Sequence, residues 1–247
     1  MDRMLYVGMT GAQQAMRAQH VNNNNLANTN TAGFRADTHE FRSAEIEGPG
    51  FRSRVNSVAE GRGIDFSQGP MQSTGRDMDV AVQGEGWIAV QGPDGEEAYT
   101  RAGDLRVNAN GILTNGSGHP VLGDAGPVAV PPHDELSIGN DGTVSIVPQG
   151  QTGDAMAMTD RLKLVNPDEE DLTKGPDGLM RMADGEPAEA DAGVRLSTGV
   201  LEGSNVSATE SLVNMIELSR SYEMQVKTMQ TAEENSQAAS ELLRSAG

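Results

Sequence analysis

Cysteine is absent from this chain of 247 residues, and aromatic residues make up only 3% of it. Without cysteine the chain has no disulfide framework and no thiolate ligands for a metal. A core with few aromatic rings must be built from small aliphatic side chains, and hydrophobic residues amount to 36%. We therefore expect a modest core that is shared among short strands.

Long apolar runs are also missing, since none approaches the roughly 20 residues that cross a bilayer. The sequence is therefore not expected to span a membrane. Residues 1–20 include Asp2, Arg3 and Arg17 and lack the continuous apolar stretch of a cleaved secretory signal. If the chain leaves the cytoplasm, we expect it to use another export route.

Basic residues are scarce: 18 Lys and Arg stand against 36 Asp and Glu, which gives a formal net charge of -18. Residues 1–63 hold seven basic and six acidic residues, so the excess of acid lies beyond them. Because an acidic chain repels phosphate groups, neither nucleic acid nor an anionic membrane surface is an expected partner.

Motifs for catalysis are missing too. The four histidines are scattered, and no HExxH, phosphate-loop or GxSxG pattern occurs. Asp77 and Asp79, two residues apart on an expected strand, share one face, and a solvated start of a strand is the simpler interpretation. We assign no catalytic, cofactor-binding or metal-binding residue.

Helical periodicity is present at both ends of the chain. Seam positions recur every three or four residues from Leu5 to Leu26 and from Leu212 to Leu243, which is the spacing of helices that pack on other helices. Ser207, followed three residues later by Glu210, has the capping-box form. Ala, Gln, Asn and Ser hold several seam positions, which favours packing among many subunits.

The middle of the chain, roughly 64–203, contains short alternating runs separated by glycine-bearing turns, which is typical of β-hairpins. Residues 148–160 and 166–193 are expected to be long surface loops. Residues 36–75 sustain neither period, so we expect an extended connector that orders only on assembly.

The predicted fold class is α+β, with long N- and C-terminal helices paired as a coiled coil and a central all-β domain of short hairpins. The predicted domains are an N-terminal helix with its following motif, an extended connector, the all-β domain and a C-terminal helix, at residues 1–35, 36–75, 76–200 and 201–247.

Residues 22–35 read NNNNLANTNTAGFR, a run of poor helix formers directly after a helical pattern. We expect Asn22 to Asn25 to hydrogen-bond to neighbouring subunits. Asn28 to Gly33 should end the helix, with Gly33 free to adopt a positive φ. Phe34 is then expected to lead the chain outward.

Residues 24–35 resemble the signature NNLAN-x-x-T-x-GF-[KR] of the flagellar rod and hook family. Residues 199–206, GVLEGSNV, with parts of 215–232, are similar to the C-terminal signature of that family, and parts of 76–107 are similar to its β domain. The chain is thereby identified as a member of this family. It looks most like the proximal rod branch, with the distal rod branch as the nearest alternative and another axial protein of the rod and hook as a further one.

The resemblance implies a structural subunit of the basal-body rod that lies in the periplasmic space and transmits torque. It also implies export by the flagellar type III apparatus without a cleaved signal. The implied partners are other copies, proximal rod subunits and the distal rod protein FlgG. The implied subunit-interface residues are Leu5, Met9, Met16, Asn24, Asn25, Leu26, Asn28, Gly33, Phe34, Asn205, Leu212, Met215, Tyr222, Val226, Met229 and Leu243.

Two other classes of function stay open at this point. One is a periplasmic enzyme acting on peptidoglycan, in which Asp77 or Asp79 would serve as acid or base. The other is a carbohydrate-binding β module, for which the terminal helices would be dispensable.

Overall fold

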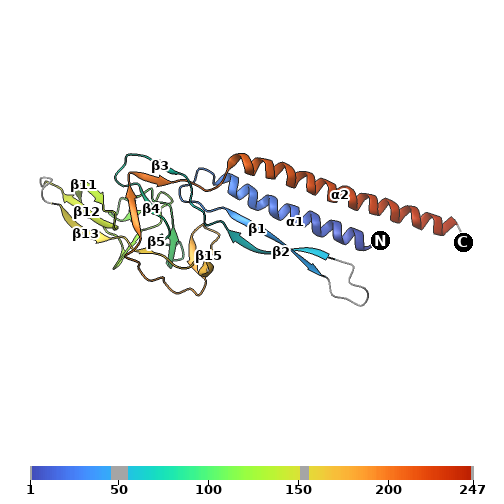
Figure 1. Ribbon diagram of the computed structural model, residues 1–247, viewed down its shortest axis with the longest axis horizontal. Coiled ribbons are helices and arrows are strands. Elements are labelled where there is room, and N and C mark those ends of the chain that lie inside the picture. Colours follow the sequence, from blue (N-terminus) through green and yellow to red (C-terminus); the bar gives the residue numbers. More distant parts are fainter. Residues whose placement is uncertain (1, 46–54, 151–155, 246–247) are drawn as a thin grey trace. The chain divides into compact units, whose positions relative to one another are not determined.

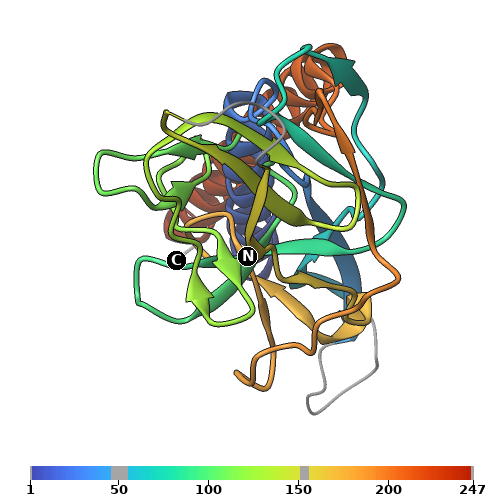
Figure 2. The same cartoon turned by 90° about the vertical axis from the view of Figure 1, so that its left-hand side faces the viewer.

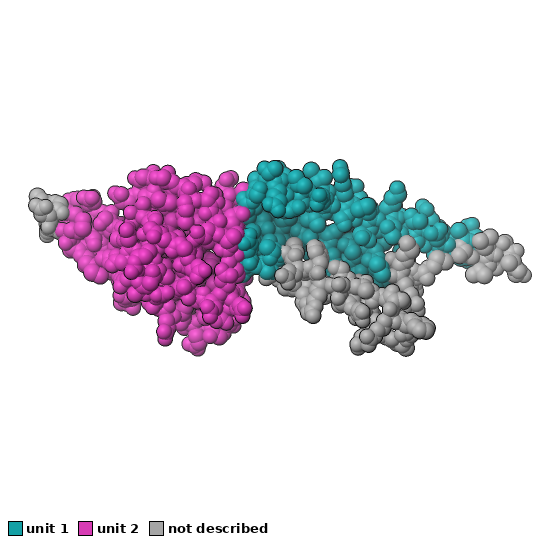
Figure 3. All heavy atoms as spheres, in the orientation of Figure 1, with its two compact units in different colours: residues 1–28, 36–65, 206–247 teal, residues 29–35, 66–205 magenta. Residues whose placement is uncertain are grey.

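The computed structural model describes residues 2–45, 55–150 and 156–245 (Figure 1). The fold is α+β, as expected: α1 (Asp2–Ala27) and α2 (Ala208–Ser245) stand at the ends of the chain, with short strands between them. The chain forms two compact units (Figure 3). Unit 1 comprises residues 1–28, 36–65 and 206–247, and unit 2 comprises residues 29–35 and 66–205. No helix built by the described residues is long and apolar enough to cross a bilayer.

In unit 1, α1 and α2 run side by side in opposite directions, with Gly8 next to Met229 and Asn22 next to Ser211. A Cβ added at Gly8 would lie only 2.7 Å from Met229 Cγ. The buried hydrophobic residues of α1 are three alanines and a valine, and such small side chains allow the helix close contact with its neighbours. They are Ala12, Ala15, Ala18 and Val21.

The predicted seam of α1 matches this packing only in part, since its Ala12 is buried. Met9 and Met16 were expected in the seam, yet they are 44% and 57% exposed. The positions that pack in the chain lie one residue earlier, at Gly8 and Ala15. The sequence pattern favoured the largest apolar side chains, whereas the helix pair uses the smallest because these bring the backbones together.

Residues 36–75, expected to be a connector without regular structure, instead hold a β-hairpin in unit 1. β1 (Asp37–Glu45) pairs antiparallel with β2 (Val55–Ile64), and a bulge interrupts the register between His39 and Phe41. Both strands contact α1. The prediction failed because β1, DTHEFRSAE, has little apolar alternation and the bulge shifts its period.

Unit 2 is β-rich, with short antiparallel strands joined by long loops (Figure 2). Its five-stranded sheet has the order β14 (Leu164–Val165), β5 (Trp87–Gln91), β6 (Glu97–Thr100), β16 (Met180–Met182), β15 (Leu172–Lys174). A three-stranded sheet holds β11 (His133–Ile138), β12 (Thr143–Pro148) and β13 (Ala157–Arg161). The paired strands are β3 (Met71–Ser73) with β18 (Val200–Glu202), β4 (Val80–Gln83) with β17 (Arg195–Thr198), β7 (Arg106–Val107) with β8 (Leu113–Thr114), and β9 (Leu122–Gly123) with β10 (Gly126–Pro127).

The core of unit 2 is aliphatic, as the composition predicts. Val80, Ile88, Leu105 and Leu196 are among its fully buried members. The expected loop at 166–193 is more ordered than predicted, since it contains β15, β16 and a 3-10 helix at Glu169–Asp171. β13 likewise occupies part of the expected loop at 148–160.

Adjacent residues of α1 test the close packing of the helices. Ala15→Leu should overpack the buried face and destabilise unit 1 by roughly 1–3 kcal/mol, whereas Met16→Leu on the exposed face should change little. Hydrogen exchange of the α2 amides measures the difference. Equal protection in the two variants would contradict the small-residue interface.

The raised pKa of Tyr99 in β6 predicts how the stability of unit 2 depends on pH. Burial raises its pKa to about 12, its hydroxyl donates to Glu97 Oε1 at 3.0 Å, and it accepts the N–H of Ala188 at 2.7 Å. An unfolded tyrosine ionises near pH 10, so stability is complete below that pH and falls as pH rises toward about 12.

Tyr99→Phe should remove this part of the pH dependence. Urea unfolding of both proteins at about pH 9 and about pH 11.5 measures it. The wild type should lose more stability between the two pH values than the variant does, and identical losses would show that Tyr99 does not titrate as proposed.

Candidate functional site

The asparagines at the end of α1 bond within unit 1. Asn22 Nδ2 donates to the carbonyl of Ser211 at 2.7 Å. Asn25 Nδ2 donates to the carbonyl of Asp37 at 2.8 Å, and the N–H of Asp37 donates back to Asn25 Oδ1 at 2.9 Å. Within the single chain, the side-chain amides of Asn22 and Asn25 therefore bond to backbone groups of α2 and β1, and bonds of these asparagines to neighbouring subunits stay a prediction.

Gly33 adopts the predicted left-handed conformation after α1 ends at Ala27, with φ of +66°. A Cβ at this position would overlap the backbone of Arg101 and Ala102. The N–H of Gly33 donates to the carbonyl of Glu202 at 2.8 Å. Close backbone approach, added to the positive φ, therefore requires glycine here.

A buried ionic cluster lies next to Gly33 in unit 2. Glu202 Oε1 is 2.7 Å from Arg35 Nη1, and Glu202 Oε2 is 3.2 Å from Arg101 Nη1. The N–H of Gly69 donates to Glu202 Oε1 at 3.0 Å. The Arg35 contact is short but lacks hydrogen-bond alignment, so it is an ion pair rather than a directed hydrogen bond. We call Arg35, Arg101 and Glu202 the arginine–glutamate cluster.

Trp87, the one tryptophan of the sequence, lies against this cluster. The Arg35 and Arg101 guanidinium carbons are 5.7 Å and 5.2 Å from its ring centroid, within cation–π range. Arg101 also donates to the carbonyl of Gly84 at 2.8 Å. Burial lowers the pKa of Arg101, and the negative charge of Glu202 opposes that shift.

Phe34 is buried in unit 2 and does not lead the chain outward as expected. Lys174 Nζ lies 4.0 Å from its ring centroid and donates to the carbonyl of Arg35 at 2.7 Å. The N–H of Asn205 donates to the carbonyl of Phe34 at 3.3 Å. Two segments that are far apart in the sequence, 33–35 and 202–205, therefore meet in one unit.

Large apolar side chains remain on the outer face of α2. Leu212, Val213, Ile216 and Met224 are between 50% and 64% exposed, and they form what we call the outer α2 stripe. At about 100° per residue these four fall on one side of the helix, opposite buried Ser211 and Ala232. On α1, Tyr6, Val7, Met9 and Met16 are also exposed.

The other expected interface residues of unit 1 are mostly half-buried. Asn24 is exposed, and the side chain of Leu243 lies outside the described residues. The half-buried ones are Leu5, Asn25, Leu26, Asn28, Met215, Tyr222, Val226 and Met229.

The expected carboxylate pair does not form. Asp77 lies exposed in a turn, while Asp79 is buried with its Oδ1 3.5 Å from Arg76 Nη2. The prediction that both share one strand face is therefore wrong. Among the described residues, no group of three or more His, Asp or Glu side chains is arranged to hold a metal ion.

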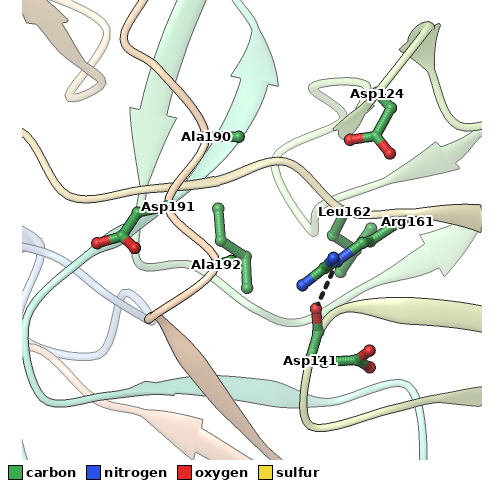
Figure 4. Close-up of a pocket in the computed structure, with 8 residues that line it drawn as sticks. Asp124, Asp141, Arg161, Leu162, Ala190, Asp191 and Ala192 are labelled. Atoms are coloured by element: carbon green, nitrogen blue, oxygen red, sulfur yellow. Dashed lines mark hydrogen bonds between the residues drawn. The ribbon is translucent and has the colours of Figure 1, made fainter.

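One small pocket of about 90 Å³ lies in unit 2 (Figure 4). Arg161 Nε donates to the carbonyl of Asp141 at 3.0 Å, and the carboxylate of Asp191 accepts the N–H of Gly193. Hydrogen bonds from Thr143 lower the pKa of Asp141. These carboxylates stabilise turns, and the pocket is smaller than the roughly 300 Å³ of typical ligand sites.

Three family models match the chain in order. They describe a flagella basal body rod protein at residues 5–35, the D1 domain of the flagellar hook proteins FlgE/F/G at 81–146, and the C-terminal part of the basal body rod proteins FlgEFG at 197–242. The flagellar basal-body rod protein FlgF of Escherichia coli K12 is 40% identical over 98% of this chain and 99% of its own length.

The chain belongs to the flagellar basal-body rod protein family. FlgF of Caulobacter vibrioides is 34% identical over 98% of this chain and 98% of its own length. FlgG of Buchnera aphidicola from Schizaphis graminum is 32% identical over 96% of this chain and 98% of its own length. The chain is thus a FlgF-like structural subunit of the basal-body rod, as its relatives are, and not an enzyme.

The arginine–glutamate cluster joins the two terminal regions that the family models match. The N-terminal rod match ends at Arg35, and the C-terminal match, which begins at residue 197, includes Glu202. The buried ion pair therefore joins one residue from each terminal region of a rod protein. Sequence reasoning singled out both segments but did not pair these residues, because nothing in the local pattern links them.

Removing the negative charge of the cluster tests its energetic role. Glu202→Gln leaves two buried guanidinium groups facing a neutral amide, so the free energy of unfolding of unit 2 should fall by roughly 3–5 kcal/mol. The exposed Glu189→Gln serves as control and should stay within about 0.5 kcal/mol of the wild type. Urea unfolding followed by Trp87 fluorescence measures both, and similar midpoints would refute a structural role for Glu202.

Proposed function

We propose that this chain is a proximal rod subunit that polymerises through its terminal helices and transmits torque along the basal-body rod. The outer α2 stripe is the observation that carries the proposal. Four large apolar side chains on one helix face are between 50% and 64% exposed in the single chain. An exposed apolar face of this kind marks an association surface.

The helices have separate faces for packing within the chain and for association with other copies. Small residues on α1 pack within the chain, while the outer α2 stripe and the exposed Met9 and Met16 face away from that packing. A contact between unlike faces of successive copies generates an open helical assembly when its rotation does not close into a ring. We infer coiled-coil packing among the terminal helices of the polymer, with the expected interface residues of α1 and α2 in its seams.

The proposed partners are further copies of the chain, other proximal rod subunits and the distal rod protein FlgG. Similarity over nearly the full length to both FlgF and FlgG relatives supports this placement. We propose export by the flagellar type III apparatus and assembly in the periplasmic space. A chain without cysteine suits such a route, because it forms no disulfides on entering an oxidising compartment.

Charge placed in the outer α2 stripe tests polymerisation. Ile216→Asp should abolish rod assembly, because a carboxylate in a packed helix interface is desolvated without a partner. Asn214→Asp adds the same charge at another exposed position of α2 and is the control. Swimming of a strain whose rod gene is replaced by each variant measures the effect.

The variants should have the wild-type circular dichroism spectrum, since both positions are exposed in the single chain. Swimming that is lost with Ile216→Asp and kept with Asn214→Asp supports the proposal. Normal swimming with Ile216→Asp would show that the stripe is not a subunit contact.

A further inference from the structure

Residues Thr29–Arg35, which we call the strap, are the part of unit 2 that comes from outside residues 66–205. Backbone groups of Gly33, Phe34 and Arg35 bond the strap to that range. The N–H of Gly33 donates to the carbonyl of Glu202 at 2.8 Å, and the carbonyl of Phe34 accepts the N–H of Asn205 at 3.3 Å. The carbonyl of Arg35 accepts Lys174 Nζ at 2.7 Å.

The side chains of Phe34 and Arg35, and the lack of one at Gly33, also fit this surface. Gly33 fits where a Cβ would overlap the Arg101 backbone. The Phe34 ring lies 4.0 Å from Lys174 Nζ, and the Arg35 guanidinium pairs with Glu202. The surface made by residues 66–205 therefore complements glycine, an aromatic ring and a guanidinium group in this order.

Residues of this surface also contact one another, independently of the strap. Glu202 still has Arg101 and the N–H of Gly69, and the Trp87 ring still has Arg101 and the edge of Phe66. The hydrophobic core cluster of unit 2 contains no strap residue. The core and the charged part of the surface are therefore formed by residues 66–205 themselves.

We propose that residues 66–205 form a peptide-docking site for a Gly-Phe-Arg segment, which the strap occupies in cis, and that the strap detaches without unfolding the β core. The ligand class is a short peptide with a glycine at positive φ, followed by an aromatic and a guanidinium side chain. The proposal concerns the single chain and does not depend on polymerisation.

Gly33→Val in the full chain tests the site, because the new side chain overlaps the Arg101 backbone and should expel the strap. Gly75→Val is the matched control: Gly75 has a nearly equal φ of +70°, but its added Cβ meets nothing within 4 Å. Trp87, 5% exposed, is the reporter. Acrylamide should quench Trp87 more strongly in Gly33→Val than in Gly75→Val, with the strand signal in circular dichroism unchanged in both.

A peptide of sequence TNTAGFRA, which is residues 29–36, should restore Trp87 protection in Gly33→Val. To occupy the site as fully as the tethered strap does, the free peptide must be present at roughly millimolar concentration. A segment held by a short linker has an effective concentration of this size. The same peptide with Met in place of Arg should bind at least tenfold more weakly, because it leaves Glu202 with one arginine. Equal rescue by both peptides, or rescue by neither, would overturn the docking site.

Hydrogen exchange of the unmodified chain gives a test that does not depend on a variant folding. The amides of Gly33 and Asn205, which bond across the strap contact, should exchange at least tenfold faster than those of Ile88 and Leu196 in the core. Equal exchange at the four amides, or loss of strand structure in Gly33→Val alone, would show that the strap is an integral part of the β core.

Discussion

The buried carboxylate of Glu202 is the constraint on which the junction of the chain's two terminal regions depends. Three groups from separate segments converge on it: the Arg35 and Arg101 guanidinium groups and the N–H of Gly69. Removing such charges from water is costly, so each charge that stays buried in the cluster needs an opposite charge or a hydrogen-bond partner. In the observed arrangement, the cluster fixes the position of Arg35 relative to Glu202 and Arg101.

The two terminal helices differ in which side chains they bury within the chain. α1 uses residues as small as Gly8 and Ala12 within the chain, whereas α2 leaves the outer stripe of large apolar residues exposed. Burying the large residues within the chain would leave little surface for association.

Sequence reasoning identified what local patterns determine. The helix stop before Gly33, its positive φ and the cap at Ser207 follow from backbone chemistry and are present, the Glu210 N–H lying 3.4 Å from Ser207 Oγ. The face of α1 that packs within the chain was not predicted, because periodicity cannot distinguish a small-residue face from an adjacent face bearing Met16. The bonds of Asn25 to Asp37 and the pairing of Arg35 with Glu202 could not be predicted, since they depend on which segments the tertiary fold brings together.

The coupling energy between Arg35 and Glu202 tests the central claim most directly. It is obtained from a double-mutant cycle of Arg35→Met, Glu202→Met and the double variant, with the free energy of unfolding of unit 2 measured for each. If Glu202 holds the two terminal regions together, the coupling energy should be at least about 1.5 kcal/mol, as for close charge pairs excluded from water. A coupling energy below about 0.5 kcal/mol, the usual limit for independent sites, would contradict the account.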